Sequence, residues 1–500
     1  KNLYEQKYSN IFLQKKCYNN KYAYFNWIKG YFMKKTKIVA TIGPASDSLE
    51  MMIDLIEQGL NVMRLNFSHG SHEEHKIRIE KMRIASLKTE KNIAILLDTK
   101  GPEIRTMKLQ EGKDVELRAG ESIIFTTNQS HIGNYDKVAV TYKNLHKDLK
   151  QGDKILLDDG LIALEVLEIK GNEINCLIIN SGFLGENKGL NLPNINVNLP
   201  ALSSKDIKDI KFGCERDVDF IAASFVRKAA DVQAVKNELK KNGKENIRII
   251  SKIENEEGIK NFDEILALSD GIMVARGDLG VEIPIEDVPF AQKLMIDKCN
   301  QVGKTVITAT QMLESMIKNP RPTRAEASDI VNAILDGTDA VMLSGETAKG
   351  KYPKQALQTM ARICRKTDNI NYDYKTCQNL SLSVAIASGT VKTADDICAK
   401  AIVILSESGD TARNIKRLKP NSIVIAITTN KKTANQLSLA RGVFSTVINK
   451  IKDVEDFHEQ AIKIAVSYDF IEDHDVIVLT SGANNEIGIT NLMKAAVIRK

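Results

Sequence analysis

Short apolar runs alternate with amphipathic segments along most of the chain, beginning at Thr36. Continuous apolar runs of this length are typical of strands buried on both faces of a parallel sheet, and the amphipathic segments between most of them predict helices. Because the two patterns alternate eight times, the sequence predicts a parallel (β/α)₈ TIM barrel. The eight predicted strands are Thr36–Gly43, Val62–Ser68, Ala94–Thr99, Asp219–Phe225, Arg248–Glu254, Gly271–Asp278, Val306–Leu313 and Ala340–Glu346.

Two regions depart from this pattern and predict further domains. Between residues 99 and 219 the helical period gives way to short alternating strands with glycine turns, which indicates an all-β domain inserted after the third barrel strand. After about residue 379 a shorter series of strands and helices predicts a small open α/β domain. The predicted boundaries are 1–32 for an N-terminal extension, 33–102 and 200–377 for the barrel, 103–199 for the inserted domain and 378–500 for the C-terminal domain.

Composition and charge narrow the class of protein. Hydrophobic residues make up 43% and charged residues 27% of the chain, as in ordinary globular proteins. No run of 18 or more apolar residues occurs, so we expect no membrane span. Most of the net charge of +6 lies in residues 1–32, which hold six lysines and one glutamate, and the nearly neutral remainder gives no reason to expect a nucleic-acid partner. The seven cysteines show no CxxC or metal-ligand spacing, which favours reduced, buried thiols.

The N-terminal segment, residues 1–32, has an unusual composition. It is basic, rich in tyrosine and asparagine, without aspartate, and it contains the single tryptophan, Trp27. Two interpretations stay open. A segment rich in Lys and Asn and poor in acidic residues is typical of transit peptides, which would direct the protein to a plastid-type organelle. Alternatively, the segment is an extension without a role, and the protein is cytoplasmic.

Polar side chains stand where the predicted barrel strands end, and in such barrels the chemistry lies at that face. Lys252 and Glu254 are two residues apart at the end of an apolar run, so they point to the same side of a strand. Glu254 and Asp278, on adjacent strands, could hold one Mg²⁺ or Mn²⁺ through oxygen ligands. No Cys/His cluster accompanies them, which argues against zinc. Taken alone, Lys252 and Glu254 could also be a structural ion pair.

Further groups at the same mouth favour phosphate chemistry. A divalent metal beside Arg64 and Lys252 suits a phosphoryl group, whose transfer is catalysed mainly by positioning and charge neutralisation. Residues 277–280 follow a strand directly, and a helical turn beginning there could bind a small carboxylate or phosphate through its free N–H groups. A site for a monovalent cation is predicted from the oxygens of Asn66, Ser68, Asp98 and Thr99. A solvated position without a chemical role is expected for His69, His72 and His75.

Long strings at these strand ends resemble the pyruvate kinase family. The resemblance runs from about residue 34 to residue 500, is densest at the barrel mouth and is closer to bacterial members than to animal ones. It is carried by residues 63–70 (MRLNFSHG), 97–105 (LDTKGPEIR), 250–255 (ISKIEN), 273–280 (MVARGDLG), 308–313 (TATQML), 319–326 (NPRPTRAE) and 342–348 (MLSGETA).

The resemblance implies transfer of the phosphoryl group of phosphoenolpyruvate to ADP, giving pyruvate and ATP in the last step of glycolysis. It implies that Arg64 holds the transferring group and that Lys252 neutralises it in the transition state. Thr310 would face the enolpyruvate and help a proton reach its methylene carbon. The backbone of Gly277 and Asp278 would lie near the substrate carboxylate.

The same resemblance implies a set of cofactor and nucleotide ligands. Mg²⁺ (or Mn²⁺) would be held by Glu254 and Asp278, and K⁺ dependence is implied by the glutamate at position 103. The K⁺ ligands would be Asn66, Ser68, Asp98 and Thr99. The nucleotide would be bound by Asn66, Arg105 and Lys188. The inserted domain would close as a lid that excludes water.

The C-terminal domain is predicted to be regulatory. A loop between a predicted strand and a predicted helix has a geometry suited to a phosphate group, and in relatives it holds a sugar-phosphate activator. The resemblance therefore implies an allosteric effector loop formed by Ser406, Ser408, Gly409 and Thr411. Glu407 and Asp410 add two negative charges there, and residues 482–488 add no basic side chain, so activation by fructose bisphosphate stays open.

Two other functions are weighed against the family's activity. A metal-dependent aldolase or lyase acting on a phosphorylated enol also pairs Glu and Asp on a divalent ion, but it needs no inserted domain and no monovalent site. A non-catalytic relative would keep the fold alone. The intact set of polar groups argues against that second alternative: Arg64, Lys252, Glu254, Asp278 and Thr310. The resemblance further implies a homotetramer, with neither nucleic acid nor a membrane as partner.

Overall fold

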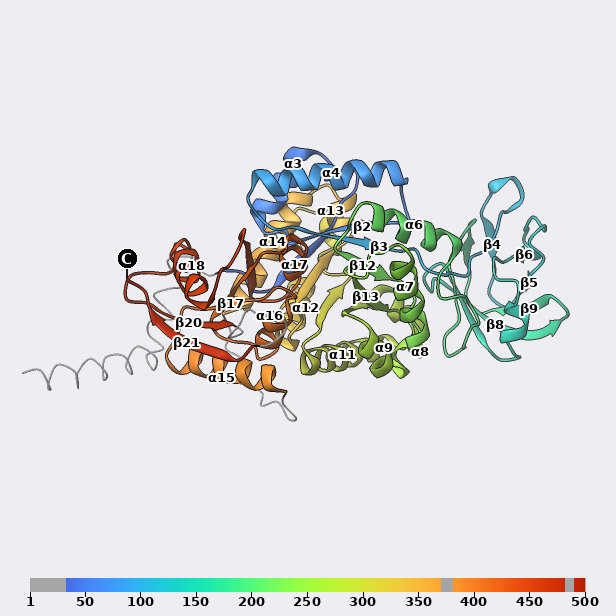
Figure 1. The fold of residues 1–500 in the computed structure, drawn as a ribbon. Helices are drawn as coiled ribbons and strands as arrows, with labels where there is room; N and C mark the ends of the chain where they lie inside the picture. The colour runs from blue at the N-terminus through green and yellow to red at the C-terminus, as the bar shows by residue number, and fades with distance from the viewer. Residues whose placement is uncertain (1–32, 370–380, 482–489, 500) are drawn as a thin grey trace, which may run out of the picture. The chain divides into compact units, whose positions relative to one another are not determined.

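The computed structural model describes residues 33–369, 381–481 and 490–499 (Figure 1). The chain divides into two compact units, Lys37–Met360 and the described parts of Lys1–Thr36 with Ala361–Lys500. The predicted N-terminal extension and the segment 482–488 lie outside the described residues. Each unit is described by itself below.

A closed barrel of eight parallel strands forms the centre of the larger unit, which confirms the predicted fold class. Nearly every strand residue is buried, because one face of each strand fills the barrel and the other packs under helices. The strands are β1 (Lys37–Thr41), β2 (Val62–Asn66), β3 (Ala94–Asp98), β12 (Phe220–Ala223), β13 (Arg248–Ile253), β14 (Gly271–Ala275), β15 (Thr305–Ala309) and β16 (Ala340–Leu343).

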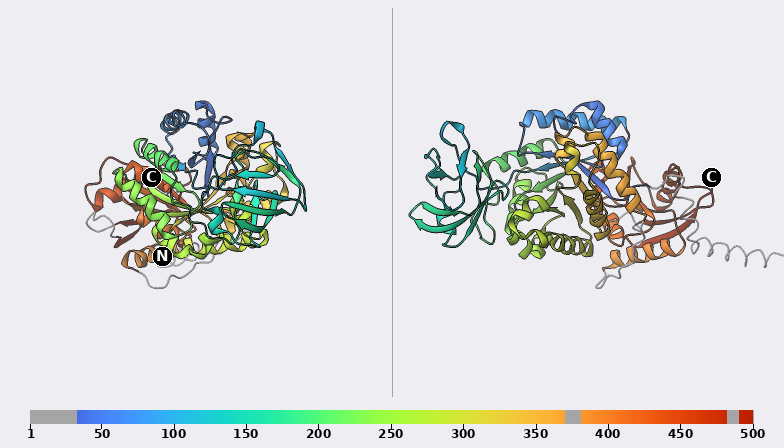
Figure 2. Two further views of the ribbon diagram at one scale, coloured as in Figure 1. Left: turned by 90° about the vertical axis from the view of Figure 1, so that its right-hand side faces the viewer. Right: turned by 180° about the vertical axis from the view of Figure 1, so that it is seen from behind.

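Helices surround the barrel strands (Figure 2). Three of them begin with a capping box, in which Ser71, Ser203 or Thr323 exchanges hydrogen bonds with an acidic residue three positions on. The helices are α3 (Leu49–Gln58), α4 (His72–Lys88), α6 (Ser204–Glu215), α7 (Ala229–Lys241), α8 (Glu256–Lys260), α9 (Phe262–Leu268), α10 (Arg276–Glu282), α11 (Val288–Val302), α12 (Arg324–Asp336), α13 (Gly345–Ala348) and α14 (Pro353–Thr367), with 3₁₀ turns at Ile285–Asp287 and Glu314–Ile317.

The inserted domain follows β3 and has its own apolar core. That core is built from side chains that alternate along its strands, such as Ile155, Leu157, Ile162 and Leu164. A six-stranded sheet, mostly antiparallel, and a two-stranded ribbon contain β4 (Val115–Leu117), β5 (Ser122–Thr126), β6 (Lys137–Ala139), β7 (Lys154–Leu157), β8 (Ile162–Lys170), β9 (Glu173–Ile178), β10 (Gly182–Leu184) and β11 (Leu190–Asn191), with α5 (Leu145–Asp148) and a 3₁₀ turn at Gln110–Gly112.

The C-terminal unit is an open α/β domain, as predicted. Its sheet has the order β19-β18-β17-β20-β21, and the last strand, which is antiparallel to β20, was not predicted. The strands are β17 (Ala401–Leu405), β18 (Ile423–Thr428), β19 (Val443–Val447), β20 (Val476–Ser481) and β21 (Leu492–Val497). The helices are α15 (Leu382–Asp396), α16 (Asp410–Lys416), α17 (Lys431–Leu437) and α18 (Val454–Val466).

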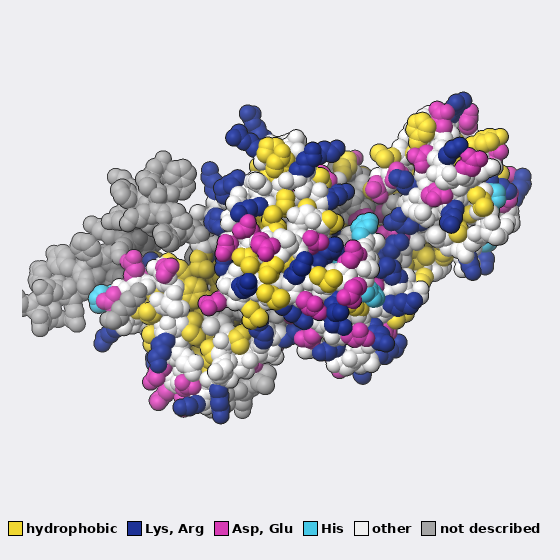
Figure 3. Space-filling model, turned by 90° about the horizontal axis from the view of Figure 1, so that it is seen from above, with side chains coloured by type: hydrophobic (Ala, Val, Ile, Leu, Met, Phe, Trp, Pro, Cys, Tyr) yellow, Lys and Arg dark blue, Asp and Glu magenta, His cyan; other side chains and the backbone are white. Residues whose placement is uncertain are grey.

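Several expectations from composition can be compared with the structure. Basic and acidic side chains are mixed over the barrel surface in the view from above, as a nearly neutral body implies (Figure 3). Among the described residues, no helix is both long and apolar enough to cross a bilayer. Cys398 is disulfide-bonded, contrary to the expectation of reduced thiols. The buried free cysteines are Cys176, Cys214, Cys299 and Cys364.

Candidate functional site

The site is built where the barrel strands end. One strand end differs from the prediction: β14 stops at Ala275, and the chain turns directly into α10 at Arg276. Asp278 therefore lies in the first turn of a short helix rather than on a strand. A helical turn over residues 277–280 was the alternative that the sequence left open, and the structure adopts it.

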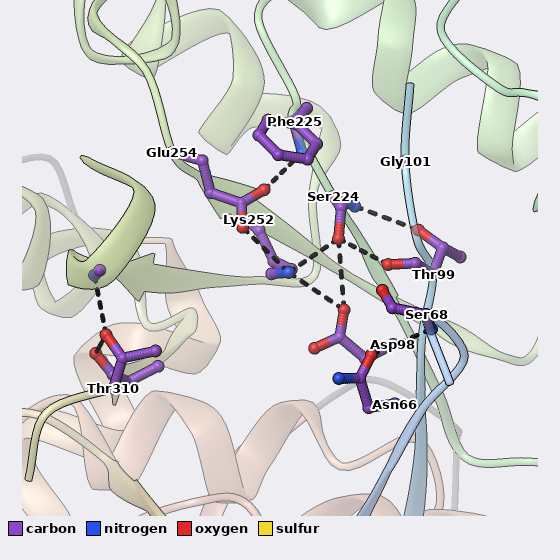
Figure 4. Close-up of polar contacts among 12 residues, drawn as sticks. Asn66, Ser68, Asp98, Thr99, Gly101, Ser224, Phe225, Lys252, Glu254 and Thr310 are labelled. Atoms are coloured by element: carbon purple, nitrogen blue, oxygen red, sulfur yellow. Dashed lines mark hydrogen bonds and ion pairs between the residues drawn. The ribbon is translucent and has the colours of Figure 1, made fainter. Parts of the chain in front are cut away.

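Lys252 lies at the centre of the mouth with three oxygen partners (Figure 4). Its Nζ donates to Ser224 Oγ at 2.7 Å and lies 2.9 Å from Glu254 Oε1 and 3.2 Å from Asp98 Oδ1. The contact between Lys252 and Glu254 is the one that their spacing predicted. The second carboxylate, from β3, was not predicted as a partner of this lysine. The ammonium is therefore fixed from the ends of β12 and β3 as well as from its own strand, β13.

Charge and burial shift the ionisation of this cluster. Burial would raise the pKa of Asp98, but the charges of Lys252 and Arg64 outweigh burial and hold it below its usual value. Burial would lower the pKa of Lys252, but Asp98 and Glu254 outweigh burial and raise it. Burial, with the charge of Asp278, raises the pKa of Glu254 despite the neighbouring ammonium. The negative charge of Asp278 thus contributes to the raised pKa of Glu254 across the mouth.

Arg64 extends the cluster toward β1. Its Nε donates to Asp98 Oδ2 at 2.6 Å, and its Nη1 donates to Thr41 Oγ1 at 2.8 Å. Because the Arg64 side chain is almost fully buried, the guanidinium keeps a fixed direction. Two cations, Arg64 and Lys252, thus share the Asp98 carboxylate, and Lys252 also pairs with Glu254, so both cations are held in fixed positions where an anionic substrate could meet them.

Ser224 belongs to the site but was missed in the sequence. Its Oγ accepts from Lys252 and donates to the Thr99 carbonyl oxygen at 2.7 Å. An uncharged serine after an apolar run gives no chemical signal of its own. The register of the parallel strands could have found it, because Ala223 pairs with Ser251 and the next residues in each strand are Ser224 and Lys252.

The four residues predicted to hold a monovalent cation gather on one side of Lys252 (Figure 4). Ser68 N donates to Asn66 Oδ1 at 3.1 Å, and Ser224 N donates to Thr99 Oγ1 at 3.2 Å. These bonds hold carbonyl, amide, hydroxyl and carboxylate oxygens close together. Neutral oxygens with a single carboxylate suit a weakly charged hard cation. Nearby Glu103 is paired with Arg105 at 2.5 Å.

Thr310 lies across the mouth in a strained conformation. Its φ of 68° lies in the left-handed region, which β-branched residues rarely adopt. Strained backbone of this kind is concentrated at functional sites. Its Oγ1 donates to the Ala309 carbonyl at 2.6 Å and accepts from Gly277 N at 2.8 Å. The hydroxyl of Thr310 is thereby fixed at the start of the helix that carries Asp278.

A cavity of about 340 Å³ separates the inserted domain from the barrel. Arg105 and Lys188 line it together with Asp278, so these predicted nucleotide and metal residues do face one space. Lys188 Nζ lies 2.9 Å from Asp158 Oδ2, and Arg105 Nη1 donates to the Asn187 carbonyl at 2.6 Å. Arg64, Asn66 and Lys252 do not line this cavity, and they lie deeper in the barrel mouth.

The donor set fits a hard divalent cation that is only partly coordinated by protein. Glu254 and Asp278 offer carboxylate oxygens, and Glu254 is also held by the Phe225 N–H at 2.6 Å. Within the described ranges, no group of three or more His, Cys, Asp or Glu side chains could hold a metal. Two carboxylates leave most ligand positions to water and substrate oxygens, as Mg²⁺ prefers.

The histidine prediction is wrong for one residue. His75 is 2% exposed, stacks on Phe67 with 4.1 Å between ring centroids, and places Nε2 2.9 Å from the His69 carbonyl oxygen. Burial lowers the pKa of His75 to about 4. The ring thus supports the loop after β2 from beneath, as a neutral group.

The predicted effector loop lies in the C-terminal unit between β17 and α16. Glu407 fills part of it: its carboxylate accepts from Thr429 N at 2.9 Å and from Thr429 Oγ1 at 2.8 Å. Ser408 Oγ donates to Asp410 Oδ2 at 2.7 Å. Three donors that a phosphate could use are therefore bonded to carboxylates of the chain itself.

Comparisons with known proteins show which family the chain is similar to. A family model described as the barrel domain of pyruvate kinase matches residues 33–357, and one described as its alpha/beta domain matches residues 384–496. Pyruvate kinase of Bacillus licheniformis is 50% identical over 474 residues, covering 93% of this chain and 81% of the relative. That of Clostridium acetobutylicum is 46% identical, covering 93% and 100%. A crystal structure of a pyruvate kinase from Cryptosporidium parvum superposes with a TM-score of 0.89 at 43% identity, covering 93% of this chain and 96% of that one.

Proposed function

The chain belongs to the pyruvate kinase family, and from that premise we propose that its barrel mouth transfers the phosphoryl group of phosphoenolpyruvate to ADP, giving pyruvate and ATP. One observation carries the assignment of roles. Lys252 is held among Asp98, Glu254 and Ser224, with Arg64 on the far side of the same aspartate. A phosphoryl group placed there meets two directed cations at once.

Arg64 and Lys252 would orient and neutralise the transferring group. Phosphoryl transfer leaves little covalent chemistry to the protein, so catalysis comes from positioning and from charges that are already in place. Both cations are held by hydrogen bonds before substrate binds, so little reorganisation is needed as charge develops. Lys252 would act as a fixed charge, because its neighbours raise its pKa and keep it protonated.

Thr310 would serve the proton step at the enolpyruvate carbon. Its hydroxyl is fixed by Gly277 N and by the Ala309 carbonyl, so it can hold a proton or a water molecule at one position. The backbone of Gly277 and Asp278, at the start of α10, would lie near the substrate carboxylate, with the Gly277 N–H directed to Thr310 Oγ1.

Glu254 and Asp278 would hold Mg²⁺ or Mn²⁺, which supplies positive charge between the substrate oxygens and the phosphoryl group. K⁺ would bind in the oxygen cluster that was predicted for it: Asn66, Ser68, Asp98 and Thr99. Arg105 and Lys188 would take the nucleotide phosphates from the inserted domain, and Asn66 from the barrel side. Closure of that domain would exclude water from a reaction that hydrolysis would waste.

Substitution of the central lysine tests these roles. Lys252→Met should lower pyruvate formation by several orders of magnitude while the protein stays folded. Lys304→Met is the matched control, because Lys304 is partly buried at the opposite end of the barrel, where its Nζ donates to the Leu266 carbonyl at 2.6 Å. Initial rates with phosphoenolpyruvate, ADP, Mg²⁺ and K⁺ compare the two. Full turnover in Lys252→Met would remove this residue from the mechanism.

The aldolase or lyase and the non-catalytic relative are both less well supported than the kinase. An aldolase or lyase would not need a nucleotide, so a reaction that requires ADP separates it from the proposed activity. A non-catalytic relative would show no turnover with any substrate pair. Membership of the family, with every predicted mouth residue present, favours the kinase over both.

Further proposals concern assembly, regulation and location. A homotetramer is supported by exposed apolar side chains, such as Phe290 on α11 and Val497 on the edge strand β21, and sedimentation analysis tests it. An effector bound at Ser406, Ser408, Gly409 and Thr411 would have to displace Glu407 from Thr429. The protein would work in the cytoplasm, or in a plastid-type organelle if residues 1–32 act as a transit peptide. Imaging a fusion of residues 1–32 decides between the two locations.

A further inference from the structure

A second cavity lies where the chain passes between the barrel and the inserted domain, and we call it the neck cavity. Its volume is about 440 Å³, and it is lined by residues 100–103, 141–143, 199–200 and 203–205. These segments are the outgoing crossing, a loop of the inserted domain, the returning crossing and the start of α6. Of the residues that the proposed mechanism uses, only Glu103 lines the neck cavity. The neck cavity shares Pro102, Glu103 and Leu199 with the cavity that Asp278 lines, and its other lining residues are its own.

Lysines dominate the charge of the neck cavity. Lys100, Lys143 and Lys205 line it, against the single carboxylate of Glu103. Lys205 is paired with Asp209 at 2.6 Å, and Lys100 is 3.7 Å from Glu103. Lys143 is exposed and makes no ion pair or hydrogen bond with the described part of the chain. Of the lining lysines, Lys100 thus has only a distant carboxylate partner, and Lys143 has none among the described residues.

The surface around the neck cavity is also positively charged. In the view from above, Lys and Arg side chains gather where the barrel joins the inserted domain (Figure 3). α6 adds exposed Lys208 and Lys211 beside Lys205. Grouped like charges repel one another and raise the local positive potential, which attracts small anions.

Neutral groups in the neck cavity complete a set of donors for oxyanions. The hydroxyls of Thr141 and Ser204 line the cavity, whereas that of Ser203, which lines it too, already donates to Asp206 Oδ2 at 2.6 Å. The N-terminus of α6 does not itself explain the site, because Asp206 already accepts from Ser203 N and Ser203 Oγ. The anion would be held by side-chain ammonium and hydroxyl groups, which bind phosphate oxygens as charge-assisted donors.

We propose that the neck cavity binds a small phosphate anion with two or more negative charges. The ligand would touch Lys143 of the inserted domain, Lys100 on the outgoing crossing and Lys205 on α6. One molecule would then link the barrel to the inserted domain through both crossings. This step rests on the proposed function: closure of the inserted domain would bend these crossings, so occupancy of the neck cavity would change how readily that domain closes.

Calorimetry with inorganic pyrophosphate on the metal-free, full-length protein tests the proposal without any catalysis. Two binding events are expected, one at the neck cavity and one at the nucleotide side. Lys143→Glu should weaken the affinity of the neck-cavity event at least tenfold. Lys211→Glu is the matched control, because it makes the same charge change on α6 but does not line the cavity, and it should shift neither event more than twofold. Lys188→Gln should weaken only the other event.

Hydrogen exchange provides the second readout. Pyrophosphate should slow exchange at residues 100–103 and 199–205 in the wild type and in Lys211→Glu, but not in Lys143→Glu. A parallel titration with glycerol 3-phosphate tells whether a phosphate monoester suffices or a diphosphate is required. Equal weakening by Lys143→Glu and Lys211→Glu, or a single binding event that Lys188→Gln abolishes, would overturn the neck site and leave the kinase assignment untouched.

Discussion

Replacing Ser224 by alanine should slow catalysis while the barrel stays folded. The Lys252 ammonium has one neutral partner, Ser224 Oγ at 2.7 Å, and two charged ones, Glu254 at 2.9 Å and Asp98 at 3.2 Å. Without the hydroxyl, only the two carboxylates direct the ammonium. It should then move toward them and away from the position at which it meets the phosphoryl group.

The size of the effect follows from the bond that is lost. A hydrogen bond to a charged group contributes about 1.5–3 kcal/mol. If that loss falls on the transition state, kcat should drop roughly 10- to 150-fold, since about 1.4 kcal/mol corresponds to a factor of ten. The KM for phosphoenolpyruvate should change less, because Arg64, in the role proposed for it, would still hold the substrate phosphate. Ser224 also donates to the Thr99 carbonyl at 2.7 Å, so the K⁺ concentration for half-maximal activity should shift too.

Ser251→Ala is the matched control for this experiment. Ser251 is also buried at the end of β13, but its hydroxyl bonds to Ser269 Oγ at 2.6 Å and does not reach the mouth. Steady-state kinetics over a range of K⁺ concentrations, with thermal unfolding measured in parallel, compare the two variants. The reasoning fails if kcat in Ser224→Ala stays within twofold of the wild type, or if both variants lose activity and stability equally.

Three further predictions use the same protein. Replacing K⁺ by tetramethylammonium, which is too large for the oxygen cluster around Asp98, should lower kcat at least ~10-fold in initial-rate assays. Glu254→Gln should raise the Mg²⁺ concentration for half-maximal activity by about tenfold or more, measured by Mg²⁺ titration of the rate. Burial lowers the pKa of His75 from 6.5 to about 4, so the unfolded chain binds more protons between these pH values, and stability falls as pH drops through that window. The loss is about 2 kcal/mol at pH 5. His75→Gln should therefore show a smaller drop in thermal midpoint from pH 7 to pH 5 than the wild type, and an equal drop would contradict the assignment.

The strands could be predicted because their physical signal is local. Eight apolar runs buried on both faces gave eight barrel strands, and the position of the mouth followed from where those runs ended. Errors occurred at the ends themselves. The run at Gly271–Asp278 was read as one strand, although the chain turns into a helix at Arg276. An edge strand such as β21, with few buried side chains, carries too weak an apolar pattern to be recognised.

The contacts between strands were harder to predict because they depend on register. Alternation placed Lys252 beside Glu254, and the structure has them 2.9 Å apart. Nothing in the residue types showed that Asp98 would serve both Arg64 and Lys252, or that Ser224 would join them. The loop after β2 likewise makes a contact that the residue types alone did not reveal. A histidine three residues into a helix reads as solvated, yet packing against Phe67 buries His75.

The cluster at the mouth bears on which residue could neutralise charge and which could transfer a proton. Burial alone would lower the pKa of Lys252 and allow it to exchange protons, but the charges of Asp98 and Glu254 outweigh burial and raise it. Lys252 therefore stays protonated at neutral pH and suits charge neutralisation rather than acid–base work. In the proposed mechanism, the proton for the enolpyruvate would then come from the other side of the mouth. Thr310 is placed there, with a hydroxyl fixed at 2.8 Å from Gly277 N and a backbone strained enough to hold its direction.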